Sequence, residues 1–341
     1  MSAPTQTEIA VGGPWFEDFA LGQVFDGAPG LTLTEGHAAL HQAITGDRLR
    51  LALDAPLCRE VTGSERALAH PNLVCDVAIG QSTGPTQRVR GNLFYRGLVL
   101  ARPVFIGDTL RTRTEVVGLK QNRRREGAPA TGLVALRIRT VNGAGEELLD
   151  FWRCPMIPLR DSGAETGHSD SFDHLPETLD RSALEAASPR WRLDVLRERT
   201  PAPHHSDLEV GSTFVIESGE TVSAAPELAR LTLNVAMAHT DPTKAERGKR
   251  LVYGGHTISV AAAHATRAIP AIATVIAWEG CDHLGPVFEK DVLRTELRVG
   301  ETTSLEQGGM VRLQALVSAV RDAREPDPEP VLDWRFVALV A

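Results

Sequence analysis

Two stretches of the chain alternate apolar and polar positions and thereby predict β-strands. Between residues 134 and 139 the aliphatic residues Val134, Leu136 and Ile138 alternate with Ala135, Arg137 and Arg139. From 311 to 319 the apolar positions are separated by residues that include Arg312, Gln314 and Ser318. A period of two places one row of side chains in the core and the other toward solvent. Because short turns join such neighbouring strands, we expect an antiparallel sheet.

Two segments of the C-terminal half predict helices that precede the strands. PELARLTLNVAMA (Pro226–Ala238) opens with a proline suited to a first helical turn and continues with helix-forming residues. LVYGGHTISVAAAHATRAIP (Leu251–Pro270) contains a glycine pair, then an alanine-rich helix that Pro270 ends. Because this helix is apolar nearly all round, we expect it to be buried. The order of helices and strands predicts an α+β fold, with the sheet packed on a central helix.

The chain contains an internal repeat. Three pairs of similar blocks occur in the same order: DFALGQVF (18–25) with DLEVGSTF (207–214), RPVFIGDTLRT (102–112) with GPVFEKDVLRT (285–295), and LLDFW (148–152) with VLDWR (331–335). The first pair is offset by 189 residues and the other two pairs by 183. This nearly constant spacing predicts two tandem copies of one domain.

The repeat also suggests where the two copies begin and end. We place the N-terminal copy at 14–159 and the C-terminal copy at 206–341. A polar connection at 160–205 separates them, with a short helix near Ser182–Ala187. The first copy shows the same order of helix and strands as the second.

Composition narrows the class of protein. The 341 residues carry a net charge of −8, which disfavours nonspecific nucleic-acid binding. No apolar run approaches the length of a membrane span, and the N-terminus lacks the basic and apolar regions of a signal peptide. The four cysteines are scattered, without the spacing of a zinc site or a disulfide framework. We therefore expect a cytoplasmic protein without a structural metal.

The residues that could carry chemistry cluster in the second copy. Asn234-Val-Ala-Met-Ala-His239-Thr-Asp241 is followed by Tyr253-Gly-Gly-His256 at the start of the apolar helix. On this spacing, and on the PVFxxDxLRT block, the sequence resembles the MaoC-like (R)-specific enoyl-CoA hydratases, a hotdog-fold family. The stretch Arg250–His256 (RLVYGGH) is also similar to that of mesaconyl-CoA hydratase-like proteins. The resemblance covers essentially the whole chain and implies a double hotdog, in which each antiparallel sheet wraps around a central helix.

The resemblance implies a hydro-lyase that reversibly hydrates a 2-enoyl-CoA thioester to a 3-hydroxyacyl-CoA. Such a reaction needs a base for the water, and the imidazole of His239 suits this role near neutral pH. Asn234 would position the water, although an amide cannot itself exchange a proton. The backbone N–H groups of Gly254 and Gly255 would polarise the thioester carbonyl, because they stand at a helix N-terminus and lack a Cβ.

Several further residues are candidates for the site, each with an alternative structural role. Asp241 either orients His239 or caps local backbone. Expected substrate contacts come from Tyr253, His256, Lys244, Arg247 and Arg250. The basic side chains Lys244, Arg247, Lys249 and Arg250 could meet the phosphates of coenzyme A, as could Lys120 with Arg123, Arg124 and Arg125. Solvated loops also carry such charges, so both interpretations stay open. No cofactor beyond the thioester substrate is expected, and the chain could be a monomer or a homodimer.

The first copy departs from the motif. Aligning Asp47 with Asn234 places Ala52 where His239 stands, so we expect this copy to be noncatalytic and to form the other wall of the acyl-CoA tunnel. Two other functions stay open: a catalytically weak acyl-CoA binding module, and a hotdog thioesterase that would use Asp76. The adjacent Cys281-Asp-His283 does not build a triad, because triad members meet in space and not in sequence.

Overall fold

The computed structural model describes residues 9, 11–125, 127–245, 248–322 and 327–341. In these residues both halves of the chain contribute to one 12-stranded antiparallel sheet. The N-terminal half supplies β1 (Val24–Phe25), β2 (Leu31–Thr32), β3 (Gly91–Leu100), β4 (Thr109–Gln121), β5 (Thr131–Val141) and β6 (Glu147–Pro158). The C-terminal half supplies β7 (Thr213–Val215), β8 (Glu220–Thr221), β9 (Ile272–His283), β10 (Val292–Ser304), β11 (Gly309–Val320) and β12 (Glu329–Val340).

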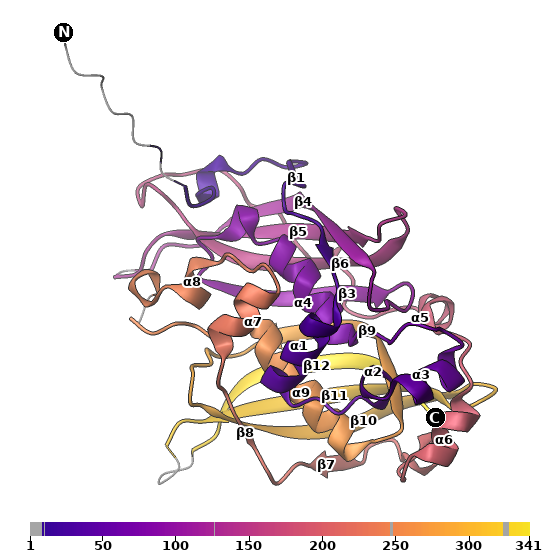
Figure 1. Ribbon diagram of the computed structural model, residues 1–341. Helices are drawn as coiled ribbons and strands as arrows, with labels where there is room; N and C mark the ends of the chain where they lie inside the picture. Colours follow the sequence, from indigo (N-terminus) through magenta and orange to yellow (C-terminus); the bar gives the residue numbers. More distant parts are fainter. Residues whose placement is uncertain (1–8, 10, 126, 246–247, 323–326) are drawn as a thin grey trace.

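The strand order shows the internal repeat directly. The main path runs β1-β4-β5-β6-β3-β9-β12-β11-β10-β7, so the second half repeats the order of the first in reverse. The two halves join where β3 pairs with β9, with Tyr95 opposite Cys281 and Val99 opposite Ala277. Figure 1 shows the N-terminal half, in indigo and magenta, beside the orange and yellow C-terminal half. One chain thus contains two copies of the same strand order, joined edge to edge in a single sheet.

The helices lie mainly on one side of this sheet (Figure 1). The α-helices are α1 (Glu35–Thr45), α2 (Arg50–Leu53), α3 (Ala55–Thr62), α4 (Pro71–Gln81), α5 (Arg181–Ala187), α6 (Leu193–Arg199), α7 (Ala225–Leu231), α8 (Met237–Thr240) and α9 (Gly254–Ala268). Short 3-10 helices occur at Phe16–Asp18, Gly84–Thr86, His205–Asp207 and Pro242–Lys244. The central helices α4 and α9 contact each other and are buried along nearly their whole length. This confirms the burial that the apolar sequence of the second helix predicts.

The turn before β4 and its counterpart before β10 have the same hydrogen bond. Asp108 Oδ2 accepts the Phe105 N–H at 3.0 Å, and Asp291 Oδ2 accepts the Phe288 N–H at 2.9 Å. Both aspartates belong to the repeated PVFxxDxLRT block, so the block marks a turn that leads into a long strand. The strands predicted at 134–139 and 311–319 lie in β5 and β11 and are confirmed.

The single helix expected at Pro226–Ala238 is wrong in its extent. Helix α7 ends at Leu231, the chain turns through Leu233 with φ 61°, and α8 begins only at Met237. Close packing accounts for the break, because a Cβ on Gly80 of α4 would lie 1.7 Å from the carbonyl oxygen of Thr232. The turn places Asn234 in a loop rather than on a helix.

The connection between the halves is more ordered than its polar composition suggests. The short helix expected near Ser182–Ala187 is α5, but a second helix, α6, follows it. Leu184, Leu193 and Leu196 are buried against the rest of the molecule. Isolated leucines in a polar segment give no periodic signal, which explains why the sequence did not predict α6.

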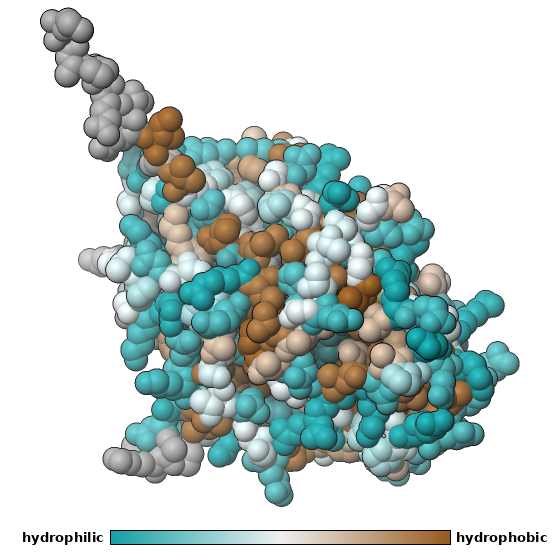
Figure 2. Space-filling view, in the orientation of Figure 1, coloured by the Kyte–Doolittle hydropathy of each residue, from teal (hydrophilic) through white to brown (hydrophobic). Residues whose placement is uncertain are grey.

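The face that carries the helices has an apolar centre. In Figure 2 hydrophobic side chains gather in the middle of this face, where Figure 1 places α1, α4 and α7. Leu40 on α1 and Val235 after α7 are 55% and 49% exposed. In the described part of the chain, no helix is long and apolar enough to cross a membrane.

Candidate active site

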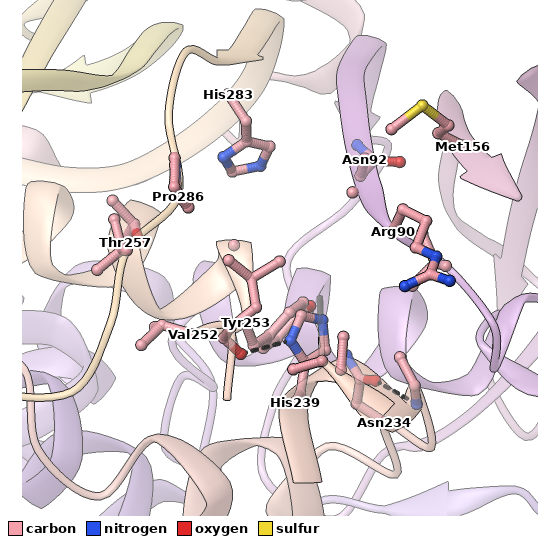
Figure 3. A pocket seen from close by; sticks show the side chains of 18 of the residues that line it. Arg90, Asn92, Met156, Asn234, His239, Val252, Tyr253, Thr257, His283 and Pro286 are labelled. Carbon is pink, nitrogen blue, oxygen red and sulfur yellow. Dashed lines mark hydrogen bonds between the residues drawn. The ribbon is translucent and has the colours of Figure 1, made fainter. Parts of the chain in front are cut away.

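A cavity of about 380 Å³ lies between the two halves of the molecule. The N-terminal half lines it with Ile79, Thr83, Val89, Arg90, Gly91, Asn92, Leu93, Tyr95, Arg153 and Met156. The C-terminal half lines it with Asn234, Ala236, Ala238, His239, Lys244, Ala245, Lys249, Leu251, Val252, Tyr253, Gly254, Thr257 and residues 283–288. In Figure 3 His239, Asn234 and Tyr253 lie together, and His283 points into the cavity from another wall.

His239 lies on the short helix α8, and the structure fixes its tautomer. Its Nδ1 is 2.8 Å from the carbonyl oxygen of Leu251, which can only accept, so Nδ1 carries the proton and Nε2 the lone pair. The ring centroid lies 5.6 Å from that of Tyr253. Burial lowers the pKa of His239, the hydrogen bond to Leu251 opposes this shift, and the positive charge of Arg153 adds to it. The imidazole is therefore held neutral, as a base requires.

Asn234 lies beside the same cavity, and one end of its amide is occupied. Oδ1 accepts the Ala236 N–H at 3.0 Å, and the side chain is buried. This contact leaves the Nδ2 group to donate a hydrogen bond into the cavity. An amide held in this way can orient a water molecule by donating to its oxygen.

The glycine pair begins helix α9, and its two members have different surroundings. Gly254 lines the cavity, and a Cβ there would lie 2.6 Å from the His283 ring. Gly255 is buried, and a Cβ there would lie 1.9 Å from Asp76 Oδ1. Neither residue tolerates a side chain, since in each case the space is taken by a neighbour. Only Gly254 combines this close packing with a place on the cavity wall.

Asp241 requires a correction, because it does not orient His239. Its Oδ1 accepts the Thr243 N–H at 2.9 Å and the Thr243 hydroxyl at 2.7 Å, so it caps the 3-10 helix that follows. The partner of the His239 ring is instead the backbone carbonyl of Leu251. Of the two roles that the sequence left open for Asp241, the structure shows backbone capping.

The expected substrate contacts divide into two groups. Tyr253 and Lys244 line the cavity, whereas His256 is buried outside its lining and Arg250 forms an ion pair with Glu289. Arg247 lies outside the described residues. Burial lowers the pKa of His256 to about 4, so this histidine is neutral in the core.

Lys249, part of the same basic run, also lines the cavity. It and Lys244 are exposed, which places them at the cavity mouth. By contrast, the other basic run (Lys120 and Arg123–Arg125) contributes no residue to the cavity lining.

The chain is similar to known proteins along most of its length. The sequence pattern of the mesaconyl-CoA hydratase family matches residues 3–269. The chain belongs to this family. It is 28% identical to mesaconyl-CoA hydratase of Cereibacter sphaeroides over 92% of this chain and 91% of that protein. It is 30% identical to β-methylmalyl-CoA dehydratase of Chloroflexus aurantiacus over 96% of this chain and 97% of that protein.

Solved structures confirm the double hotdog fold and the MaoC-like resemblance. A conserved hypothetical protein of Mycobacterium tuberculosis, described as a double hotdog, is 47% identical with a TM-score of 0.89 and covers 97% of this chain and 99% of its own. A putative MaoC domain dehydratase of Chloroflexus aurantiacus is 26% identical, has a TM-score of 0.86, and covers 98% of this chain and 99% of its own. As a member of the mesaconyl-CoA hydratase family, the chain is a hydro-lyase of CoA thioesters.

Two residues that line the cavity, His283 and Arg153, were assigned no role in the site from the sequence. His283, at the end of β9, packs its ring on Gly254, and burial lowers its pKa to about 4. Arg153 reaches the cavity from β6 of the other half. The available signal for Arg153 was a charged residue inside the apolar run FWRCPMIP. For His283, only the tertiary structure places it beside the helix start. The neighbouring Cys281 thiol is buried with a raised pKa, which agrees with the sequence-based rejection of a triad.

The equivalent position in the first copy lacks the base. Asp47 Oδ1 accepts the Leu49 N–H at 2.7 Å, just as Asn234 accepts the N–H two residues later. This shared geometry supports the alignment that puts Ala52 in the place of His239. Asp47 instead pairs with His70 at 3.1 Å, beside a cavity of only about 20 Å³. These observations agree with the expectation of a noncatalytic first copy, which stays a prediction.

The thioesterase alternative finds no support in the placement of Asp76. Its carboxylate is buried between helices α4 and α9, outside the cavity lining, where the Ser259 hydroxyl donates to Oδ2 at 3.3 Å. A carboxylate in this position does not contribute to the cavity wall. The same oxygen lies 3.7 Å from His41 Nε2, so Asp76 belongs to a buried polar network.

Proposed function

We propose that the cavity hydrates a short, branched enoyl-CoA of the mesaconyl type, with His239 as the base. This proposal rests on the protonation of the His239 ring. Its Nδ1 donates to the Leu251 carbonyl, so Nε2 has a free lone pair, and the ring lines the cavity. The names of the two curated relatives support the substrate class. The cavity volume of about 380 Å³ is in the range that a small ligand occupies.

The proposed reaction uses three groups of the chain. His239 Nε2 takes a proton from a water molecule whose oxygen accepts a hydrogen bond from Asn234 Nδ2. The water oxygen bonds to the β-carbon, and the electron pair of the double bond moves toward the thioester oxygen. The N–H of Gly254 and the positive end of the α9 dipole stabilise the resulting negative charge. Protonated His239 then gives its proton to the α-carbon, so that one water has been added and the base is restored.

The adenine nucleotide part of coenzyme A carries phosphates that need positive partners. Lys244 and Lys249 supply these at the cavity mouth, and Lys249 lies 5.9 Å from the centroid of the Phe288 ring. The acyl group would enter between the two halves, with the phosphates left at the surface. Entry of the acyl group in this direction agrees with the apolar and aromatic side chains that line the cavity, such as Ile79, Tyr95 and Tyr253.

The test is the ultraviolet absorbance of conjugated enoyl-thioesters mixed with the protein. The panel contains crotonyl-CoA, longer and branched enoyl-CoAs, and mesaconyl-CoA, each also mixed with His239→Ala. We expect the conjugated band to disappear fastest with mesaconyl-CoA in the wild type, and to persist in the variant. Binding of every thioester without loss of the band would contradict the proposed reaction and favour a binding module.

The pH dependence of kcat/KM should report the depressed pKa of His239. The base acts only when neutral, so activity is full above its folded-state pKa and falls as pH drops through that value. Because burial and Arg153 lower this pKa from 6.5, the acid limb should lie below pH 6.5, with a plateau around neutrality. A profile of kcat/KM from pH 4.5 to 8.5 measures this. An acid limb centred above pH 6.5 would show that another group controls the rate.

A further inference from the structure

Arg153 is a buried cation on the cavity wall, and its partners in the protein are neutral. Its side chain is only 3% exposed. Its Nη2 donates to the Ser82 carbonyl and to the Thr86 hydroxyl, both at 2.8 Å, while Nε has no acceptor. Among the residues that the structure describes, no aspartate or glutamate forms an ion pair with it. A buried charge normally has a counter-ion, because removing it from water is costly.

Helix α4 explains part of this arrangement. Ser82 is the C-cap of α4, so the guanidinium lies at the negative end of a helix dipole. A helix end corresponds to roughly half an elementary charge. The dipole therefore leaves a large part of the positive charge of Arg153 uncompensated. Arg153 lines the cavity in which the acyl group is proposed to bind.

We propose that Arg153 binds a carboxylate carried by the acyl group, and so selects dicarboxylic acyl-CoA substrates over simple enoyl-CoAs. This inference rests on the proposed function, since it places the substrate in the same cavity. Arg153 is a specificity-determining residue supplied by the N-terminal copy. The copy without the base thereby contributes a direct contact to the substrate of the other.

The position of Arg153 relative to His239 agrees with the chemistry. In a mesaconyl thioester the free carboxylate is attached to the β-carbon, the atom that receives the hydroxyl group. The residue that binds this carboxylate must therefore lie next to the base that activates the water. Arg153 and His239 line the same cavity, and the positive charge of Arg153 contributes to lowering the pKa of the imidazole. In a straight-chain enoyl-CoA an alkyl group would occupy this place and leave the guanidinium without a counter-ion.

Three other arginines, Arg96, Arg335 and Arg250, already have carboxylate partners. Arg96 lies 2.6 Å from Asp282, and Arg335 lies 2.7 Å from the same carboxylate. Arg250 is paired with Glu289. These pairs neutralise the charges in the protein itself, so they offer a substrate carboxylate less than Arg153 does.

The first measurement uses the wild-type protein and two unreactive thioesters. Succinyl-CoA and butyryl-CoA have acyl chains of equal length, and they differ in a carboxylate or a methyl group on the β-carbon. A charge-assisted hydrogen bond in a buried site predicts that succinyl-CoA binds on the order of 30-fold more tightly by calorimetry. Equal affinity, or tighter binding of butyryl-CoA, would overturn the proposal. Because neither thioester has a double bond, this result is independent of whether the protein is a hydratase.

The second measurement compares two substrates in Arg153→Met and Arg153→Lys. Arg153→Met should lower kcat/KM for mesaconyl-CoA on the order of 100-fold while leaving crotonyl-CoA within a few-fold, and Arg153→Lys should restore part of the preference. An equal loss on both substrates in a folded variant would show that Arg153 only caps α4. Arg137→Met, on the neighbouring strand β5, is the matched control and should leave the substrate ratio unchanged.

Thr86→Val tests the same proposal if the arginine variants do not fold. It removes one tether of the guanidinium and retains its charge. We expect it to weaken succinyl-CoA binding several-fold and to leave butyryl-CoA binding unchanged. Loss of both affinities together would contradict a specific contact with the carboxylate.

Discussion

Replacing His239 with alanine is expected to lower kcat about 10²–10⁴-fold, the usual contribution of a positioned general base. The expected loss is large because Asn234 cannot take over the proton, and because Asp241 is bound to Thr243 instead. Substrate affinity should change little, since Lys244 and Lys249, the proposed partners of the coenzyme A phosphates, are retained. The measurement is the initial rate of loss of the enoyl-thioester band at saturating substrate.

His174→Ala is the matched control for this variant. His174 is exposed in the connection between the halves and lies outside the cavity lining, so its removal should leave kcat unchanged. Circular dichroism should show that both variants fold. A folded His239→Ala protein with full hydratase activity would remove His239 from the mechanism.

Gly80→Ala should destabilise the protein, although alanine ordinarily favours a helix. Alanine gains about 1 kcal/mol over glycine in helix propensity. The new Cβ would lie 1.7 Å from the Thr232 carbonyl oxygen and 2.7 Å from its carbon, so backbone must move. Overpacking of this kind costs about 3 kcal/mol, which exceeds the gain in propensity. We expect Tm to fall by roughly 5 °C.

The same substitution should impair the reaction, because the displaced backbone leads directly into Asn234. A shift of about 1 Å in a positioning group can cost on the order of 100-fold in rate. Gly84→Ala is the control, since a Cβ at Gly84 has no neighbour within 4 Å. Unchanged Tm and kcat in Gly80→Ala would show that the Thr232 loop adapts freely and that its position does not matter for catalysis.

The sequence predicted those parts of the fold that rest on local patterns. The alternation in β5 and β11 and the apolar helix α9 are repeated over many residues, so each carries its own signal of burial. The break between α7 and α8 carried no such signal, because every residue there is compatible with a helix. It depends on the close approach of Gly80, a residue about 150 positions earlier in the chain.

The sequence by itself determined the tandem repeat, the α+β class and the cluster of His239, Asn234 and Gly254. These follow from spacing within one copy, where residues close in sequence remain close in space. Only the tertiary structure decided that Asp241 caps backbone, that Leu251 fixes the His239 tautomer, and that Arg153 and His283 share the cavity. The pairing of β3 with β9 brings the two copies together, and contacts between residues far apart along the chain leave no local pattern for a sequence to show.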